Sequence, residues 1–396
     1  MEDILKLLGR KQELFYQDVI DNETKILQMV SNSSFIVIGG AGSIGTAVTK
    51  EIFKRNPKKL HVVDINENRL TELVRDIRSQ YGYISGEFKT FSLDVGSFEY
   101  DAFIKADGQY DYVLNLSALK HVRSEKDPYT LMRMINVNII NTIKTIEQSI
   151  TKNTKKYFCV STDKATYPIN MMGASKYIME MFLMSMSKDI KVSTARFANV
   201  AFSDGSLLDG FKHRIEKMQP LAAPYDIKRY FLTPKESGEL CLLSCILGEN
   251  KSIFFPRLEK SHNLLSFSDL AIKFLKSKNY EPYICQSEEE ARKLIHHLPK
   301  KGKWPCFFSK SDTTGEKEIE EFHTKNEILE KNNFINIGVF KNNLKFNDKK
   351  LDTFKKNFKE KSLTLIHDKK LLVKEFKKLI PNFDYIDKRK YLDGKM

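Results

Sequence analysis

Three side chains that can exchange protons stand together at the end of one predicted strand. Residues 156–161 are predicted to form a buried strand, and Thr162, Asp163 and Lys164 follow at its end. Doubly wound sheets hold their ligands at the carboxyl ends of the strands, so a hydroxyl, a carboxyl and an amine at this point are suited to acid–base chemistry. The structural alternative is that these residues only cap a helix or form a turn.

Met172 and Lys176 follow on the next predicted helix, four residues apart and therefore on one face. Lys176 can act as a functional cation there, or it can be an ordinary solvated lysine. Met172 would ordinarily fill a core, and its thioether cannot ionise. The role of first proton acceptor in this region therefore shifts to Asp163, Thr162 or a bound water.

A glycine-rich turn follows a predicted buried strand over residues 35–38. Its glycines at regular spacing are Gly39, Gly42 and Gly45. Small residues at these positions would let the backbone approach a pyrophosphate, whose charge would meet the helix N-terminus at Ser43 and Ile44. The alternative is a glycine turn that serves only the packing of the strand against the helix.

Carboxylates follow the next two predicted strands. Asp64 ends the first of them, where a carboxylate would bind the adenosine ribose and repel a 2′-phosphate, so the pattern predicts NAD rather than NADP. Asp94 and Val95 follow the other and fit a position that contacts the adenine of the cofactor. The alternative for Asp94 is an ordinary carboxylate at the end of a strand.

Strands and helices alternate through the first half of the chain. Strands are predicted at 35–38, 60–64, 87–93, 112–116, 156–161 and 191–195, with helices near 66–80 and 130–150. This alternation predicts an α/β fold with a doubly wound parallel sheet of the Rossmann type. We expect an N-terminal helical extension over 1–30, a NAD-binding domain over 31–200, a smaller substrate-binding lobe over 201–335 and a basic C-terminal extension over 336–396. Within the lobe, residues 279–333 look like an irregular insertion.

The net charge of +14 is concentrated near the C-terminus. Residues 341–396 hold 17 Lys or Arg and 8 Asp or Glu, which leaves the rest of the chain only mildly basic. Apolar residues recur among these lysines, a pattern that predicts packed helices with solvated lysine faces rather than a nucleic-acid arm. They are Phe354, Phe358, Leu363, Leu365, Leu371, Leu372, Phe376 and Leu379. Such a basic face could equally bind an anionic substrate or a membrane surface.

Other features of the composition indicate a cytoplasmic protein. No run of eighteen apolar residues predicts an integral membrane segment, and the N-terminus lacks the features of a signal peptide. The five cysteines lack a metal-ligand spacing, so we expect buried thiols and no metal site. They are Cys159, Cys241, Cys245, Cys285 and Cys306.

Several blocks of sequence, in this order, resemble the extended short-chain dehydrogenase/reductase family. They are similar to its polysaccharide-biosynthesis branch, which contains nucleotide-sugar 4,6-dehydratases. The blocks are the glycine turn, residues 115–122 (NLSALKHV), 161–165 (STDKA), 168–170 (PIN), 172–176 (MGASK) and 196–200 (RFANV). Weaker similarities to the family lie at 315–317, 320–322 and 392–396. Ile139-Ile140 and Ala198 depart from the usual family pattern. We expect these departures to change the packing near the cofactor or the sugar.

The resemblance implies a reaction in which NAD takes hydride from C4 of the sugar, water leaves across C5 and C6, and hydride returns to C6. Asp163 would be the acid toward the C6 oxygen and Lys164 the base at C5. Thr162 would bind the C4 hydroxyl, and Lys176 would hold the nicotinamide ribose. Methionine in place of tyrosine, as at Met172, occurs within this branch.

The resemblance also implies contacts with the ligands. Ala118 would contact the cofactor, and Lys120 and His121 the substrate. Asn199, Lys228 and Arg229 would meet the diphosphate and base, with a solvated basic turn as the alternative for the last two.

The expected substrate is UDP-N-acetylglucosamine, and the expected product is a 4-keto-6-deoxy sugar for a bacterial surface glycan. Enzymes of this kind commonly form homo-oligomers. Two alternatives stay open. One is an epimerase, acting at C4 or combining dehydration with inversion at C5, and Met172 argues against the simple C4 form. The other is a non-catalytic NAD-binding regulator.

Overall fold

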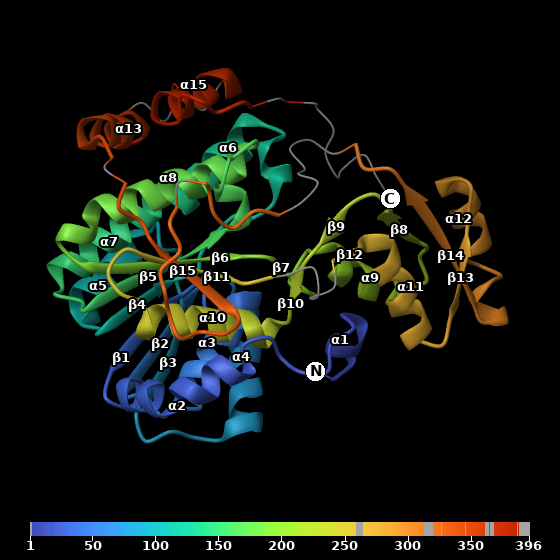
Figure 1. Cartoon of the computed structure of the whole chain (residues 1–396), viewed down its shortest axis with the longest axis horizontal. Helices are drawn as coiled ribbons and strands as arrows, with labels where there is room; N and C mark the ends of the chain where they lie inside the picture. The colour runs from blue at the N-terminus through green and yellow to red at the C-terminus, as the bar shows by residue number, and fades with distance from the viewer. Residues whose placement is uncertain are drawn as a thin grey trace.

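An eight-stranded sheet forms the centre of the molecule (Figure 1). The computed structural model describes residues 2–258, 264–312, 320–325, 327–344, 346–360, 364, 368–385 and 387. In spatial order the strands are β15 (Ile337–Lys341), β11 (Ser252–Pro256), β6 (Lys191–Phe197), β5 (Lys156–Thr162), β4 (Tyr112–Asn115), β1 (Ser34–Ile38), β2 (Lys59–Asp64) and β3 (Glu87–Ser92). All neighbours run parallel except β15, which is antiparallel to β11. The predicted doubly wound α/β fold is confirmed.

Helices cover both faces of this sheet (Figure 1). One face carries α2 (Tyr16–Ser31), α3 (Ser43–Phe53), α4 (Glu67–Tyr81) and α10 (Pro234–Leu247). The other carries α5 (Phe98–Asp107), α6 (Pro128–Ile135), α7 (Asn141–Thr151) and α8 (Met171–Ser185). The central strands are buried on both sides, which explains their nearly continuous apolar sequences.

The helix predicted over 130–150 is interrupted by a π-helical turn at Asn136–Ile140. Asn138 is buried there, and its side-chain amide both accepts from the Leu119 N–H (2.9 Å) and donates to the Leu119 carbonyl (3.1 Å). The same amide donates to Ser175 Oγ (2.9 Å). The widened turn therefore ties the loop after β4 to α8, a link that helical periodicity could not predict.

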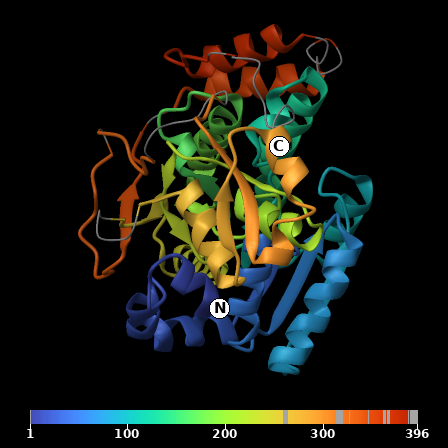
Figure 2. The same cartoon turned by 90° about the vertical axis from the view of Figure 1, so that its right-hand side faces the viewer.

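A smaller lobe lies beside the sheet, at the right in Figure 1 and toward the viewer in Figure 2. It holds a three-stranded sheet, β13-β14-β8, and two strand pairs. Its strands are β7 (Asn199–Val200), β8 (Leu221–Pro224), β9 (Lys228–Arg229), β10 (Phe231–Leu232), β12 (Leu265–Ser266), β13 (Glu281–Ile284) and β14 (Lys303–Ser309). Its helices are α9 (Leu207–Glu216), α11 (Phe267–Ser277) and α12 (Glu288–Leu294), and α1 (Glu2–Leu7) packs against α11.

Two features of the lobe differ from expectation. Residues 281–309, expected to be irregular, form a regular strand–helix–strand unit whose β14 is buried beside β8. Charged residues and prolines in these short strands hide their pattern. The expected boundary at residue 200 also does not divide the chain into two separate domains. Both α10 and β11, which come after it, return to the main sheet, and β15 joins that sheet from beyond residue 335.

The C-terminal segment adds α13 (Asp348–Glu360) and α15 (Lys369–Leu379), which lie over α6 and α8 (Figures 1 and 2). Phe354, Phe358, Leu372 and Phe376 are buried in one cluster with Met171 and Met172 of α8. The predicted packed helices with lysine faces are confirmed for these two helices, except that Leu371 is exposed. Predicted apolar positions 363 and 365 lie outside the described residues.

All five cysteines are buried and unpaired, as predicted. Among the described residues, no helix combines the length and the apolar character needed to span a membrane.

Candidate functional site

The ends of three strands and the loops that follow them form one edge of the sheet. Ile38 pairs with Asn115, so β1 and β4 end side by side. Asn115 pairs with Cys159, and β5 continues in the same direction to Thr162. The glycine turn, the loop that carries Ala118 and the residues around Asp163 follow these ends. Topology thus gathers most of the predicted site residues at the edge where open α/β sheets hold ligands.

The glycine turn is packed too tightly for side chains at two of its three predicted positions. Gly39 has a φ of +72°, and a Cβ there would lie 2.7 Å from the Ser117 nitrogen. A Cβ on Gly45 would lie 2.1 Å from the Gly39 carbonyl oxygen. Backbone atoms cannot move aside as the end of a side chain can, so both positions require glycine.

Gly42 differs from the other two glycines. It is the N-cap of α3, its φ of −72° is open to any residue, and a Cβ there would lie 3.4 Å from the Gly39 carbonyl oxygen, an ordinary contact. Packing within the protein therefore does not require glycine at position 42. Close approach by a bound pyrophosphate is the reason for Gly42 that stays a prediction.

Helix α3 begins at Ser43, directly after Gly42. No side chain caps its N-terminus, so its first N–H groups can face an anion. Ser43 Oγ donates to Asp204 (2.7 Å), and Ile44 packs against the main core.

Asp64 lies beside this turn. One carboxylate oxygen accepts a hydrogen bond from the Ala41 N–H (3.0 Å), and the other accepts one from the Asn66 N–H (3.0 Å). The carboxylate is therefore held next to the turn, as the prediction for a ribose ligand requires.

Asp94 lies at the next strand end. It accepts from the Gly96 N–H (2.8 Å) and from Arg133 (3.3 Å), while the Val95 carbonyl accepts from Lys144 (3.0 Å). Ala118 is half-buried in the loop after β4.

The polar group after β5 is a connected unit. Asp163 begins a single 3₁₀ turn, and its Oδ1 accepts from Thr162 Oγ1 (2.8 Å) and from Lys164 Nζ (3.2 Å). The Asp163 side chain is only 5% exposed, whereas Lys164 is 29% exposed. An acid and an amine in contact, one buried and one partly open, can exchange protons with a bound molecule.

Met172 and Lys176 lie on the first turns of α8, both buried. Lys176 Nζ donates to the Val160 carbonyl (2.9 Å), and burial lowers the pKa of this ammonium to about 8. The Met172 side chain belongs to the apolar cluster shared with the C-terminal helices. Its N–H donates to Glu125 Oε1 (2.9 Å), and burial raises the pKa of Glu125 to about 7.

Lys120 and His121 lie beside the turn at Ser203–Gly205. Lys120 Nζ donates to Ser203 Oγ (3.3 Å), and a Cβ on Gly205 would lie 3.1 Å from His121 Nε2. His121 is half-buried, and this burial lowers its pKa, whereas Lys120 is exposed to solvent. These two residues are therefore near Asp204, which contacts Ser43 of the glycine turn.

Asn199 and Arg229 gather around a residue that sequence reasoning did not assign to the site, Glu320. Asn199 Nδ2 donates to Glu320 Oε1 (2.8 Å), and Arg229 acts electrostatically on the same carboxyl. Asp163 and Lys164 also act on it. Lys228, by contrast, is exposed to solvent.

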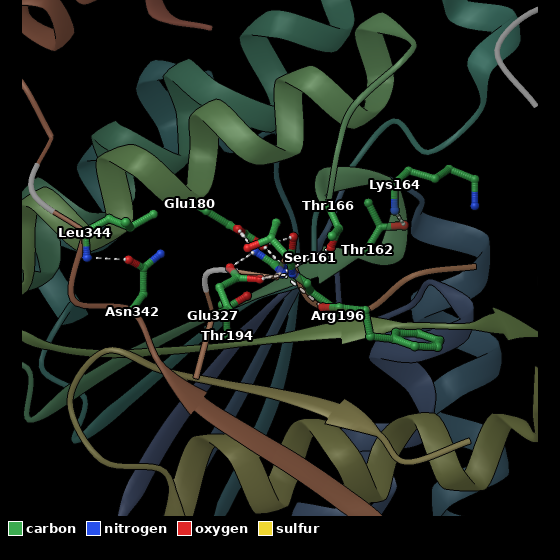
Figure 3. A network of polar contacts seen from close by, with 12 residues as sticks. Ser161, Thr162, Lys164, Thr166, Glu180, Thr194, Arg196, Glu327, Asn342 and Leu344 are labelled. Atoms are coloured by element: carbon green, nitrogen blue, oxygen red, sulfur yellow. Dashed lines mark hydrogen bonds and ion pairs between the residues drawn. The ribbon is translucent and has the colours of Figure 1, made fainter. Parts of the chain in front are cut away.

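Arg196 is a second unassigned residue, and Figure 3 shows its contacts. Its guanidinium, 1% exposed, forms ion pairs with Glu180 (2.7 Å) and Glu327 (3.0 Å). Ser161 Oγ donates to the same Glu180 (2.6 Å). Arg196 thus joins β6, α8 and the segment after β14 directly beneath the polar group at the end of β5 (Figure 3).

Little in the sequence could have identified these residues. Glu320 belongs to one of the weaker similarities to the family, but the neighbouring sequence does not indicate that Glu320 lies near the site. The other weak similarities, at 315–317 and 392–396, lie outside the described residues.

Solved structures with the same fold include nucleotide-sugar enzymes. The structure named Pen from Bacillus thuringiensis superposes with a TM-score of 0.64 at 21% identity, over 80% of this chain and 89% of that one. DesIV from Streptomyces venezuelae, a dTDP-glucose 4,6-dehydratase, superposes with a TM-score of 0.55 at 16% identity, over 73% of this chain and 88% of that one. At these identities the likeness concerns the fold.

Curated relatives are more similar in sequence. The uncharacterized membrane protein MJ1061 of Methanocaldococcus jannaschii is 32% identical over 59% of this chain and 69% of that protein. The capsular polysaccharide biosynthesis protein CapD of Staphylococcus aureus is 27% identical over 66% of this chain, which spans only 44% of CapD. The UDP-glucose 4-epimerase of Rickettsia prowazekii is 27% identical over 74% of this chain and 89% of that protein.

A family model described as polysaccharide biosynthesis protein matches residues 35–341. The match begins in β1 and ends in β15, so it contains every strand of the main sheet and the smaller lobe. It therefore spans the glycine turn, the polar group after β5 and Glu320. The chain belongs to the polysaccharide biosynthesis protein family.

Proposed function

We propose that this chain is a nucleotide-sugar 4,6-dehydratase that acts on UDP-N-acetylglucosamine and retains NAD. The observation that carries the proposal is the contact between Asp163 and Lys164 at the end of β5, on a site whose neighbouring Met172 cannot ionise. Elimination of water needs one group that removes a proton and another that gives one. An acid and an amine 3.2 Å apart supply both.

The residues around the glycine turn fit NAD. Gly39 and Gly45 leave no room for side chains, and the uncapped start of α3 at Gly42 suits a pyrophosphate. Asp64 would accept hydrogen bonds from the adenosine ribose. When bound, NAD would supply a reversible hydride acceptor for C4 of the sugar. The residues that would line the rest of the cofactor are Asp94, Val95 and Ala118.

The remaining steps belong to this chain's own side chains. Lys176 would hold the nicotinamide ribose, and its charge would favour transfer of the C4 hydroxyl proton to Asp163, Thr162 or a bound water, while Thr162 binds that hydroxyl. Lys164 would remove the C5 proton, and Asp163 would protonate the C6 hydroxyl, which leaves as water. Lys164 would then return its proton to C5, which completes the 6-deoxy sugar. The residues that would contact the diphosphate and the rest of the substrate are Asn199, Arg229, Lys120 and His121.

An epimerase is the second candidate, and the relative from Rickettsia prowazekii favours it. A C4 epimerase would return hydride to the opposite face of C4 and the proton to the C4 oxygen, and it would lose no water. A thioether at position 172 cannot carry that proton, which favours the dehydratase. A dehydratase that also inverts C5 would use the same Asp163–Lys164 pair.

Incubation of the purified protein with UDP-N-acetylglucosamine, followed by mass spectrometry, tests the proposal. We expect a product lighter by one water, and NMR would then report the configuration at C5. A product of unchanged mass with inverted C4 would establish the epimerase instead. No reaction with a panel of UDP- and dTDP-sugars, by protein with bound NAD, would contradict both.

A further inference from the structure

Glu320 is a buried carboxyl group that the roles above leave unused. Its residue is only 7% exposed, and both of its oxygens accept hydrogen bonds. Oε1 accepts from Asn199 Nδ2 (2.8 Å), and Oε2 accepts from the Tyr230 N–H (2.9 Å). The side chain is therefore held in one orientation, between β7 and the residue that follows β9.

The segment that carries Glu320 is anchored to the sheet by Arg196 (Figure 3). The guanidinium donates to the Phe322 carbonyl (2.9 Å) and, through two nitrogens, to both oxygens of Glu327 (3.0 Å each). Glu180 of α8 binds the same guanidinium from the other side. Two-point hydrogen bonds between a guanidinium and a carboxylate hold both groups in one orientation. The segment is therefore held against the sheet, and Glu320 keeps a defined position.

The charged groups that act on Glu320 are Asp163, Lys164 and Arg229. Burial, and then the negative charge of Asp163, raise the pKa of Glu320 well above its usual 4.5. Electrostatic coupling of this kind is mutual, so a charge on Glu320 also acts on Asp163 and Lys164. The proton count of Glu320 and the charge state of the Asp163–Lys164 pair are therefore linked.

We propose that Glu320 is a positioning residue of this site, which sets the charge on the Asp163–Lys164 pair and holds Asn199 toward the substrate. The inference rests on the proposed function, because it concerns the proton handling of that reaction. With Glu320 protonated, Asp163 alone balances Lys164. With Glu320 ionised, a second negative charge stabilises the Lys164 ammonium and opposes its action as a base.

Glu320→Gln tests this role, with Glu321→Gln as the matched control, since Glu321 is the exposed neighbour. The amide cannot ionise, so the variant should lose the part of the kcat profile that follows the titration of Glu320. We expect the pH at half-maximal kcat to change by about one unit. KM for the nucleotide sugar should rise by about threefold or more, because an amide has one acceptor oxygen, so either Asn199 or the Tyr230 N–H loses its acceptor. Glu321→Gln should keep the wild-type profile, and a Glu320→Gln profile equal to wild type would overturn the inference.

A second measurement does not depend on turnover. Infrared difference spectra between acidic and alkaline pH should contain a carboxylic-acid band that wild type and Glu321→Gln share and Glu320→Gln lacks. If the wild-type protein turns over no nucleotide sugar, the proposed function fails, while these spectra still test Glu320. Identical spectra for wild type and Glu320→Gln would contradict its protonation.

Discussion

At the scale of single residues, the site separates groups that can carry protons from one that cannot. Asp163, Lys164 and Thr162 form a hydrogen-bonded unit, whereas Met172 lies in an apolar cluster with residues from the C-terminal helices. The methionine therefore has a packing role in this structure. Proton transfer in the proposed reaction belongs to the residues at the end of β5.

Met172→Leu and Lys164→Ala should separate these two roles. Met172→Leu conserves volume and removes no ionisable group, so kcat should stay within about threefold of wild type. Lys164→Ala removes the proposed base and should lower kcat by about 100-fold or more. Steady-state kinetics on both variants, with NAD content measured in each, check this. A large loss in Met172→Leu alone would contradict the assignment.

At the scale of elements, the turn between β1 and α3 is set by close backbone contact. A Cβ on Gly45 would collide with main-chain atoms of Gly39 and Gly40, which have no flexible end that can move aside. Helix α3 is in turn packed against α10. The geometry of the proposed cofactor turn thus depends on both neighbours.

Gly45→Ala should lower the free energy of unfolding by about 2 kcal/mol or more and abolish NAD binding. Gly210→Ala is the matched control, because Gly210 lies in α9 with no atom within 4 Å of the added Cβ. There the substitution should stabilise the helix by about 0.5–1 kcal/mol. Denaturant unfolding and NAD titration measure both effects. Equal stabilities for the two variants would show that the turn tolerates a side chain.

Helix α10 also carries a buried acid, Glu239, whose side chain is 3% exposed and 3.7 Å from Lys235. Burial, and then the charge of Glu51, raise the pKa of Glu239 to about 8. A raised pKa means that the folded state binds this proton more tightly than the unfolded state. Its stabilisation is present below about pH 4.5 and is lost as pH rises through about 8.

Glu239→Gln should therefore stabilise the protein at alkaline pH and have little effect near pH 5. The gain above pH 8 should be about 1–3 kcal/mol. Urea unfolding across this pH range measures it. Glu249→Gln is the control, since that carboxylate is 73% exposed and should give no pH-dependent difference. A constant offset at every pH would assign the effect to packing instead.

At the scale of the whole molecule, the C-terminal helices belong to the structure of the site. Phe354, Phe358, Leu372 and Phe376 share one apolar cluster with the start of α8, where Met172 lies. Most lysines of α13 and α15 are exposed, while the buried apolar residues of these helices share a cluster with residues of α6 and α8. The basic segment thus supports α8 from the side opposite the sheet.

Phe376→Ala should cost about 3–5 kcal/mol, because the ring is fully buried, and should also lower turnover by loosening α8. Leu371→Ala on the same helix is the control, since Leu371 is 38% exposed and should change stability by less than about 0.5 kcal/mol. Thermal unfolding and kcat on both variants test the link. Destabilisation with unchanged kcat would mean that the helices do not influence the site.

The parallel sheet could be predicted from the sequence, and so could the glycine turn, Asp64 and the group at 162–164. These features depend on local properties: the spacing of apolar residues, the residue types of turns and the positions of strand ends. It also indicated the helical character of the C-terminal segment through its apolar spacing. Only the folded structure shows which glycines of the turn are required by packing. It also shows that residues 234–256 and 337–341 return to the main sheet, and that Arg196 binds Glu180 and Glu327. It alone brought Glu320 to Asn199, 121 positions away in the chain. Such contacts depend on how distant segments pack, and no short-range pattern of residues records that.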